Sequence, residues 1–146
     1  MTVVETLQQL THRQVEALRV IETRQNEARG ASLKEIASGL RVRPPSALAH
    51  LGPLEELGLI SRFRGKSRLT RRGFTVLEEY RRHHRVAESL FSRAGLSADA
   101  TCRAAREVDL ALSHRTVESI CAAEGHPSVC PHGARISPCS TEPGAR

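Results

Sequence analysis

Apolar residues recur at helical spacing along most of the chain. The segment Thr11-His12-Arg13-Gln14 fits a capping box and precedes apolar Val15, Leu18 and Ile21, which predicts a helix to about Asn26. Gly30 then breaks the pattern. A second capping box, Ser32-Leu33-Lys34-Glu35, opens a helix with one apolar face formed by Leu33, Ile36, Ala37 and Leu40.

A third helix is predicted after Arg41-Val42-Arg43, which we interpret as a turn. Pro44 and Pro45 suit the first turn of a helix, because the N–H groups that proline lacks have no helical partner there. Pro53 removes the hydrogen bond to the Ala49 carbonyl, so we expect the helix to kink or split at that point, and we still predict helix on both sides of it. Two short strands follow, 59–63 and 67–69, joined at Gly65.

Two helices around a turn, followed by a basic hairpin, form the pattern of a winged helix-turn-helix, which places one helix in a DNA groove. Four cations on one short hairpin repel each other, so phosphate binding explains them better than stability does. The candidate DNA contacts lie on the third helix and the hairpin: Arg43, Pro45, Ser46, Ala49, His50, Arg62, Arg64, Lys66 and Arg68.

The second half of the chain is predicted to be helical until it reaches a loop. A long helix runs from Thr70 to about Arg93, and two shorter helices follow over 98–112 and 114–124. From Gly125 onward Pro, Gly, Ser and Cys dominate, which predicts a loop that is ordered only if something fastens it. The expected fold is therefore mainly α: a winged helix-turn-helix domain (1–73), a helical dimerisation and metal-binding domain (74–125) and a Cys/Pro/Gly-rich loop (126–146).

Composition and charge limit the classes of function and partner that the chain can have. The formal net charge is +6 and the sequence pI is about 9.9, which favours nucleic acid as a partner. No apolar run approaches the roughly 18 residues that span a bilayer, and the N-terminus lacks the apolar core of a signal peptide, so we expect no membrane partner and a cytoplasmic location. No glycine-rich phosphate loop or nucleophile motif is evident, so we do not expect an enzyme. A winged helix used only for protein contact is the alternative, and the cationic hairpin argues against it.

Three segments in order resemble the DtxR/MntR family of iron- and manganese-dependent repressors. These are Arg43-Pro44-Pro45-Ser46 with Leu69-Thr70-Arg71-Arg72-Gly73, then Arg82-His83-His84-Arg85-Val86-Ala87-Glu88, and finally Gly125-His126-Pro127 with Cys130-Pro131-His132-Gly133. The resemblance implies a homodimer on a double-stranded DNA operator, a divalent ion between two domains, and the short, two-domain type of regulator.

The resemblance also implies positions for metal ligands. The primary site would fall on Glu16, Arg106, Asp109 and Leu110, of which Arg106 and Leu110 cannot coordinate a cation. We hypothesise that the Arg106 guanidinium stands in for the ion and pairs with Asp109 and Glu16. The ancillary site would fall on His84, Glu88 and Cys102, with His84 and Glu88 one helical turn apart. That spacing suits a chelating pair and equally a surface His–Glu contact.

The cysteines lie in the last third of the chain, at Cys102, Cys121, Cys130 and Cys139, with His126 and His132 beside them. Four thiolates suit an iron–sulfur cluster or a tetrahedral metal site, while a thiol redox switch and ordinary buried cysteines are the other interpretations. The sequence therefore predicts a repressor that responds to an iron–sulfur cluster or to divalent Fe, Mn or Zn. The alternative is a thiol-redox-responsive or metal-independent winged-helix regulator.

Overall fold

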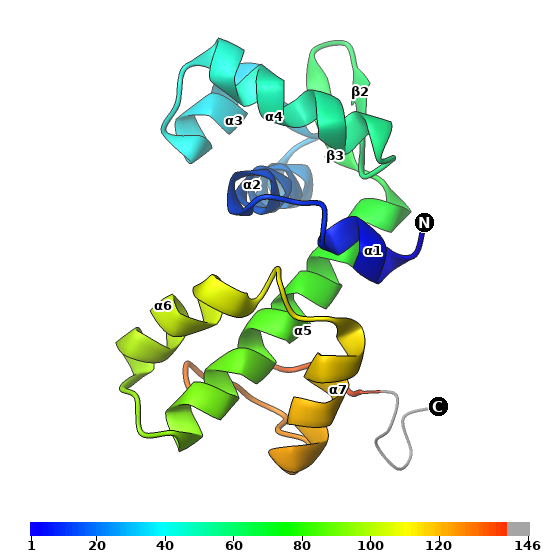
Figure 1. The fold of residues 1–146 in the computed structure, drawn as a ribbon. Helices are drawn as coiled ribbons and strands as arrows, with labels where there is room; N and C mark the ends of the chain where they lie inside the picture. Colours follow the sequence, from blue (N-terminus) through cyan, green and yellow to red (C-terminus); the bar gives the residue numbers. More distant parts are fainter. Residues whose placement is uncertain (140–146) are drawn as a thin grey trace. The chain divides into compact units, whose positions relative to one another are not determined.

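The computed structural model describes residues 1–139 and divides the chain into two compact units, Met1–Glu78 and Glu79–Arg146. The described residues form seven helices and a small sheet of three strands, so the fold is mainly α, as predicted (Figure 1). The division between units follows Glu78, whereas the predicted domain boundary follows Gly73. Within residues 1–139, every helix is too short or too polar to cross a membrane.

The first unit holds the predicted helices, each opened by the residues that predicted it. Helix α2 (His12–Glu27) follows Thr11 and α3 (Leu33–Leu40) follows Ser32, and both starts form complete capping boxes. Helix α4 (Pro44–Glu56) begins with the two prolines. A short helix at the start of the chain, α1 (Val3–Leu7), is one that the sequence pattern did not predict.

Pro53 lies inside α4 and does not split it, in agreement with the prediction that the segment is helical. The helix continues through Pro53 to Glu56. Both Pro53 and Ala49 are exposed, so water can reach the Ala49 carbonyl that proline leaves without an N–H partner. The opposite face keeps the helix in place by burying Ala47, Leu51 and Leu54.

The hairpin of the first unit consists of β2 (Ile60–Phe63) and β3 (Lys66–Leu69), joined by Arg64 and Gly65. Both joining residues have positive φ, 48° and 73°, as a two-residue type I′ turn requires. A two-residue strand, β1 (Ala31–Ser32), pairs antiparallel with β3 and gives the order β1-β3-β2. The hairpin is thereby fastened to the segment between α2 and α3.

Gly73 lies where helix α5 (Arg71–Arg93) passes the backbone of Leu59. A Cβ atom at Gly73 would lie 2.0 Å from the Leu59 carbonyl oxygen, while one at Gly52 in α4 would meet no atom within 4 Å. We therefore expect Gly73→Ala to destabilise the protein by about 3 kcal/mol through overpacking. The matched Gly52→Ala change should stabilise it by about 0.5–1 kcal/mol through helix propensity. Chemical denaturation followed by circular dichroism measures both; equal effects of the two changes would contradict this packing argument.

The second unit contains the remainder of α5, then α6 (Ala98–Val108) and α7 (His114–Ala123). Helix α6 ends at Val108, earlier than the predicted Leu112, and the intervening residues form a turn in which the N–H of Leu112 bonds to the Val108 carbonyl. Ser113 then caps α7 as predicted.

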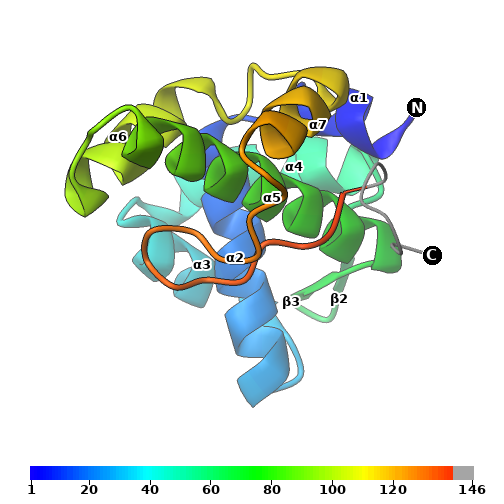
Figure 2. The ribbon, with the colours of Figure 1, turned by 90° about the horizontal axis from the view of Figure 1, so that it is seen from below.

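The segment after α7 is packed against the second unit over its described residues. Figure 2 shows it in orange and red, returning past α5. It carries three members of a buried core, which consists of Val86, Val117, Cys121, Cys130, Ile136 and Cys139. An isolated bridge between Val129 and Arg135 closes the turn within it. The predicted loop 126–146 therefore belongs to the second unit as far as residue 139; its last seven residues lie outside the described part.

Candidate nucleic-acid interface and metal-ligand groups

The candidate recognition helix presents a polar, accessible first turn. Arg43 occupies the N-cap of α4, and Pro45, Ser46 and Ala49 are exposed on its outer side. His50 is half-buried at the edge of the same face. Arg41, the C-cap residue that follows α3, has φ 56°, and the tight turn that this conformation makes leads directly into α4.

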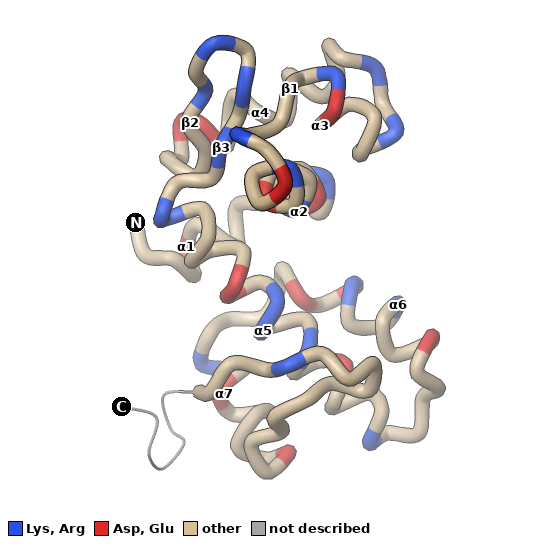
Figure 3. The backbone as a smooth tube through the Cα atoms, turned by 180° about the vertical axis from the view of Figure 1, so that it is seen from behind, with Lys and Arg blue, Asp and Glu red and all other residues tan. Residues whose placement is uncertain are grey.

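The cations of the hairpin are all exposed, and Figure 3 shows them gathered along it. Two are partly neutralised within the first unit: Arg62 lies 3.6 Å from a Glu55 carboxylate oxygen, and the Lys66 ammonium lies 3.8 Å from Glu35. Arg64 instead lies over the Phe63 ring, 5.1 Å from its centroid. Among the described residues, Arg64 and Arg68 form no ion pair. The tip and one strand of the hairpin therefore carry the most available positive charge.

The four positions that the resemblance assigns to a primary metal site do not form a ligand set of the usual kind. Glu16 belongs to the first unit, where it lies 3.8 Å from Arg13. Asp109 is fully buried in the second unit and accepts a hydrogen bond from the Tyr80 hydroxyl at 2.9 Å. Arg106 is exposed and Leu110 half-buried, and neither side chain can coordinate a cation.

Asp109 also contacts the predicted ancillary group. Its carboxylate lies 2.8 Å from His84 Nδ1, and His84 Nε2 lies 2.8 Å from Glu88. The Cys102 sulfur lies 3.7 Å from the same Nε2 atom. The structure therefore brings together His84, Glu88 and Cys102, whose ligand atoms lie within 4.8 Å of one another.

A second group shares Glu88 with the first. His132 Nδ1 lies 3.2 Å from the other Glu88 carboxylate oxygen, and Cys130 completes a set with ligand atoms within 4.8 Å. We call His84, Glu88, Cys102, Cys130 and His132 the Glu88 cluster. Glu88 is buried and Cys102 is exposed, so the cluster extends from the core of the second unit to its surface. Sequence reasoning noted His132 only as a neighbour of the cysteines, since 44 residues separate it from Glu88.

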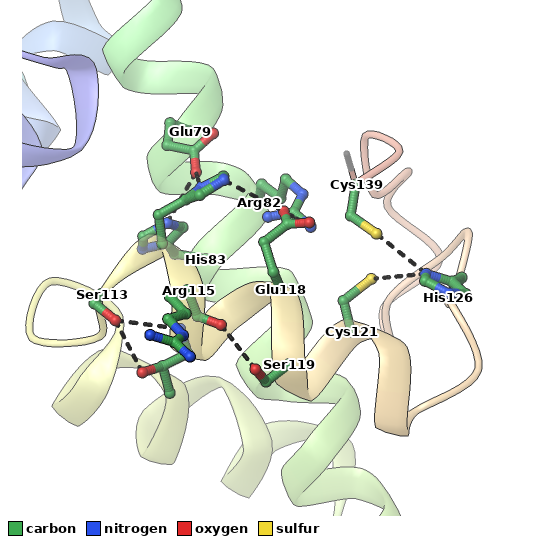
Figure 4. Close-up of polar contacts among 12 residues, drawn as sticks. Glu79, Arg82, His83, Ser113, Arg115, Glu118, Ser119, Cys121, His126 and Cys139 are labelled. Atoms are coloured by element: carbon green, nitrogen blue, oxygen red, sulfur yellow. Dashed lines mark hydrogen bonds and ion pairs between the residues drawn. The ribbon is translucent and has the colours of Figure 1, made fainter. Parts of the chain in front are cut away.

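Sequence reasoning missed a partly buried polar network between α5 and α7. Glu79 contacts His83 at 3.0 Å and His114 at 2.9 Å, and Arg82 forms an ion pair with Glu118 at 2.7 Å (Figure 4). Burial acts to raise the pKa of Glu79, but hydrogen bonds with the two histidines outweigh it and hold the pKa at about 2. The contact between Glu79 and His83 could have been predicted from spacing alone, because the two residues lie one helical turn apart.

The remaining cysteines form a third grouping, at the end of α7. Figure 4 shows the His126 imidazole in contact with the side chains of both Cys121 and Cys139. His126 Nδ1 lies 3.8 Å from the Cys121 sulfur and 3.1 Å from the Cys139 sulfur. Both cysteines are buried, and burial together with the neighbouring Cys139 thiol raises the pKa of Cys121 to about 11.

The prediction that one iron–sulfur cluster uses four thiolates is not supported. The thiols are distributed over separate groups of candidate ligands: Cys102 with His84, Cys130 with His132, and Cys121 with Cys139. The physical reason is their placement, because Cys102 is exposed on α6 while the other three are buried on α7 and on the segment after it.

Comparison with known domains accounts for both units. Residues 7–78 match the family model described as LexA DNA binding domain, and residues 70–138 match that of the iron dependent repressor, metal binding and dimerisation domain. The resemblance to the DtxR/MntR regulators is confirmed. The two models describe a DNA-binding domain and a domain of iron-dependent repressors, and such proteins are transcription regulators, not enzymes. No protein with a curated description matches the chain in sequence.

Solved structures share the DtxR/MntR-type fold. The hypothetical protein SSo2273 from Sulfolobus solfataricus is 26% identical with a TM-score of 0.83, covering 88% of this chain and 99% of that one. IdeR of T. acidophilum is 26% identical with a TM-score of 0.66, over 93% of this chain and 64% of its own. A manganese-dependent transcriptional repressor in complex with manganese is 29% identical with a TM-score of 0.67, over 84% of this chain and 57% of its own. The chain thus spans less than two thirds of these two regulators.

Proposed function

We propose that this protein is a metal-responsive, DNA-binding transcriptional repressor of the DtxR/MntR type, acting as a cytoplasmic homodimer. The observation that carries the proposal is the joining, in one chain, of a winged helix with a cationic hairpin to a metal-binding and dimerisation domain that contains the Glu88 cluster. The first turns of α4 would contact the operator, with Ser46 and His50 within reach of base edges or phosphates. The hairpin would bind phosphates of the DNA backbone next to the groove that α4 enters.

The two sets of candidate metal ligands differ in whether their side chains can coordinate an ion. The primary-site positions do not fit, because Arg106 and Leu110 offer no ligand atom and Asp109 already bonds to Tyr80 and His84. The Glu88 cluster fits, because carboxylate, imidazole and thiol groups are the ligands that divalent transition metals take in proteins. The thiols favour Zn²⁺ or Fe²⁺ over Mn²⁺.

A bound ion at the Glu88 cluster would link three segments of the second unit. His84 and Glu88 lie on α5, Cys102 lies on α6, and Cys130 and His132 lie on the segment after α7. The ion would supply positive charge to a buried carboxylate and fix these segments in one arrangement. We propose that this ordering favours the DNA-binding form of the dimer.

The proposal is tested by a mobility shift of the full chain on genomic DNA fragments, after metal removal and after addition of Zn²⁺, Mn²⁺ or, without oxygen, Fe²⁺. One of these ions should tighten binding to a subset of fragments at least tenfold. Equal binding in chelator and in all three metals would instead favour a metal-independent regulator. No retarded fragment at low salt would contradict the DNA-binding function itself.

A further inference from the structure

The end of α7 forms a turn that brings a cysteine and a histidine together. The N–H of His126 bonds to the Cys121 carbonyl at 2.8 Å, and that of Gly125 bonds to the Ala122 carbonyl at 3.1 Å, which together make a Schellman motif. In this motif the two residues corresponding to Cys121 and His126 often make an apolar contact. Here the contact is between a thiol and an imidazole, 3.8 Å apart.

His126 reaches the thiol because of an uncommon backbone conformation. Its φ is 54°, in the left-handed region that non-glycine residues rarely adopt, and Pro127 follows it directly. Such residues persist where surrounding structure fixes them, and they are frequent at functional sites. The same imidazole nitrogen lies 3.1 Å from the sulfur of Cys139, which the segment after α7 brings back from thirteen residues further along the chain.

The spacing of these three ligand atoms matches that of a metal site. With Zn–S bonds of about 2.3 Å and Zn–N bonds of about 2.0–2.1 Å, tetrahedral geometry separates nitrogen and sulfur ligands by about 3.6 Å. The observed separations of 3.1 and 3.8 Å lie on either side of that value. The three residues line a pocket of about 410 Å³, which leaves room for a water molecule as a fourth ligand.

We propose that Cys121, His126 and Cys139 bind a thiophilic divalent cation, for which Zn²⁺ is the probe, at a site separate from the Glu88 cluster. Two thiolates and one imidazole form a soft ligand set that selects such a cation over Mn²⁺ or Mg²⁺. The ion fastens residues 126–139 to the end of α7, in addition to the apolar packing of that segment.

This site has a consequence for the Glu88 cluster, and that consequence rests on the proposed function. Cys130 and His132 lie on the segment between the two ends of the new site. Fixing His126 and Cys139 therefore fixes the loop that presents two ligands to Glu88. Supporting groups of this kind change metal affinity by about 10–100-fold.

The test compares two double variants of the full chain, each lacking two thiols: Cys121→Ser with Cys139→Ser, and Cys102→Ser with Cys130→Ser. Zn²⁺ is titrated into reduced, metal-free protein against a chromophoric chelator. The first variant should bind one equivalent fewer than the natural protein at this site, while the second keeps that equivalent. Co²⁺ should likewise give sulfur-to-metal charge-transfer absorption in the second variant and none from this site in the first.

A measurement on the natural chain guards against misfolding of the variants. Zn²⁺ should slow alkylation of Cys121 and Cys139 at least tenfold relative to chelator-treated protein, as mass spectrometry of each cysteine reports. Unchanged alkylation rates, or full Zn²⁺ stoichiometry in the Cys121/Cys139 variant, would overturn the site. Recovery of a Cys121–Cys139 disulfide in protein that takes up no Zn²⁺ after reduction would also overturn it. None of these readouts uses DNA or Glu88, so their failure is distinct from failure of the proposed function.

Discussion

Replacing Arg64 and Arg68 together by alanine is expected to weaken DNA binding and to flatten its dependence on salt. Each phosphate contact contributes about 0.9 to the slope of log K against log salt, so the double change should lower the slope by about 1.8. These two cations form no ion pair among the described residues, unlike Arg62 with Glu55 and Lys66 with Glu35, so their charge is available to phosphate. Fluorescence anisotropy over a series of salt concentrations measures the slope.

The control removes the same charge elsewhere. Arg103 and Arg115 are exposed on α6 and α7, outside the winged helix. Their joint replacement by alanine should leave the slope close to that of the natural protein, because long-range charge effects are screened at moderate salt. Since the proposed hairpin contacts are to phosphate and not to bases, the Arg64/Arg68 variant should lose affinity for operator and unrelated DNA alike. An unchanged slope in that variant would show that the hairpin does not contact phosphate.

Glu88→Gln is expected to abolish the response of DNA binding to metal. Its two carboxylate oxygens serve His84 at 2.8 Å and His132 at 3.2 Å, so one side chain joins both halves of the cluster. Glutamine keeps the shape of the buried side chain and removes the charge. Since changes to supporting groups alone cost about 10–100-fold in metal affinity, loss of this shared ligand should cost more than about 100-fold. Calorimetric titration with metal, paired with the mobility shift, measures both effects.

Glu107→Gln is the matched control for that change. Glu107 is exposed on α6 and belongs to none of the ligand groups among the described residues. The Glu107→Gln variant should bind metal and DNA as the natural protein does. A Glu88→Gln protein that still tightens on DNA in response to metal would remove the Glu88 cluster from the proposed function, and it would leave the DNA-binding role intact.

The winged helix could be predicted from local sequence because local interactions specify it. Ser32 with Glu35 determines where α3 starts, the two prolines determine the start of α4, and Gly65 marks the hairpin turn. Of the two outcomes expected at Pro53, a kink or a split, the split does not occur, because the missing N–H leaves a carbonyl on the exposed face of the helix. Solvent exposure depends on the packing of the opposite face, which the local sequence does not report.

The metal-ligand groups were predictable only where their members share one helix. His84 and Glu88 lie one turn apart, so spacing places them together. His132 reaches Glu88 from 44 residues away, and Cys139 reaches His126 only because the segment after α7 turns back. Composition predicted four thiols as one set, yet the tertiary path of the chain divides them. Long-range closure of this kind carries no periodic signal in the sequence.

The hairpin turn places an arginine at a position whose backbone conformation disfavours most residues other than glycine and asparagine. Arg64 has φ 48°, a conformation that costs an ordinary L-residue roughly 1–2 kcal/mol and that glycine or asparagine adopts more readily. A chain selected for stability alone would carry asparagine there. Under the proposed function, arginine at this position gives up some folding free energy and gains a cation that can contact DNA phosphate. Stabilising substitutions at this turn should consequently raise the free energy of unfolding and weaken binding to the operator.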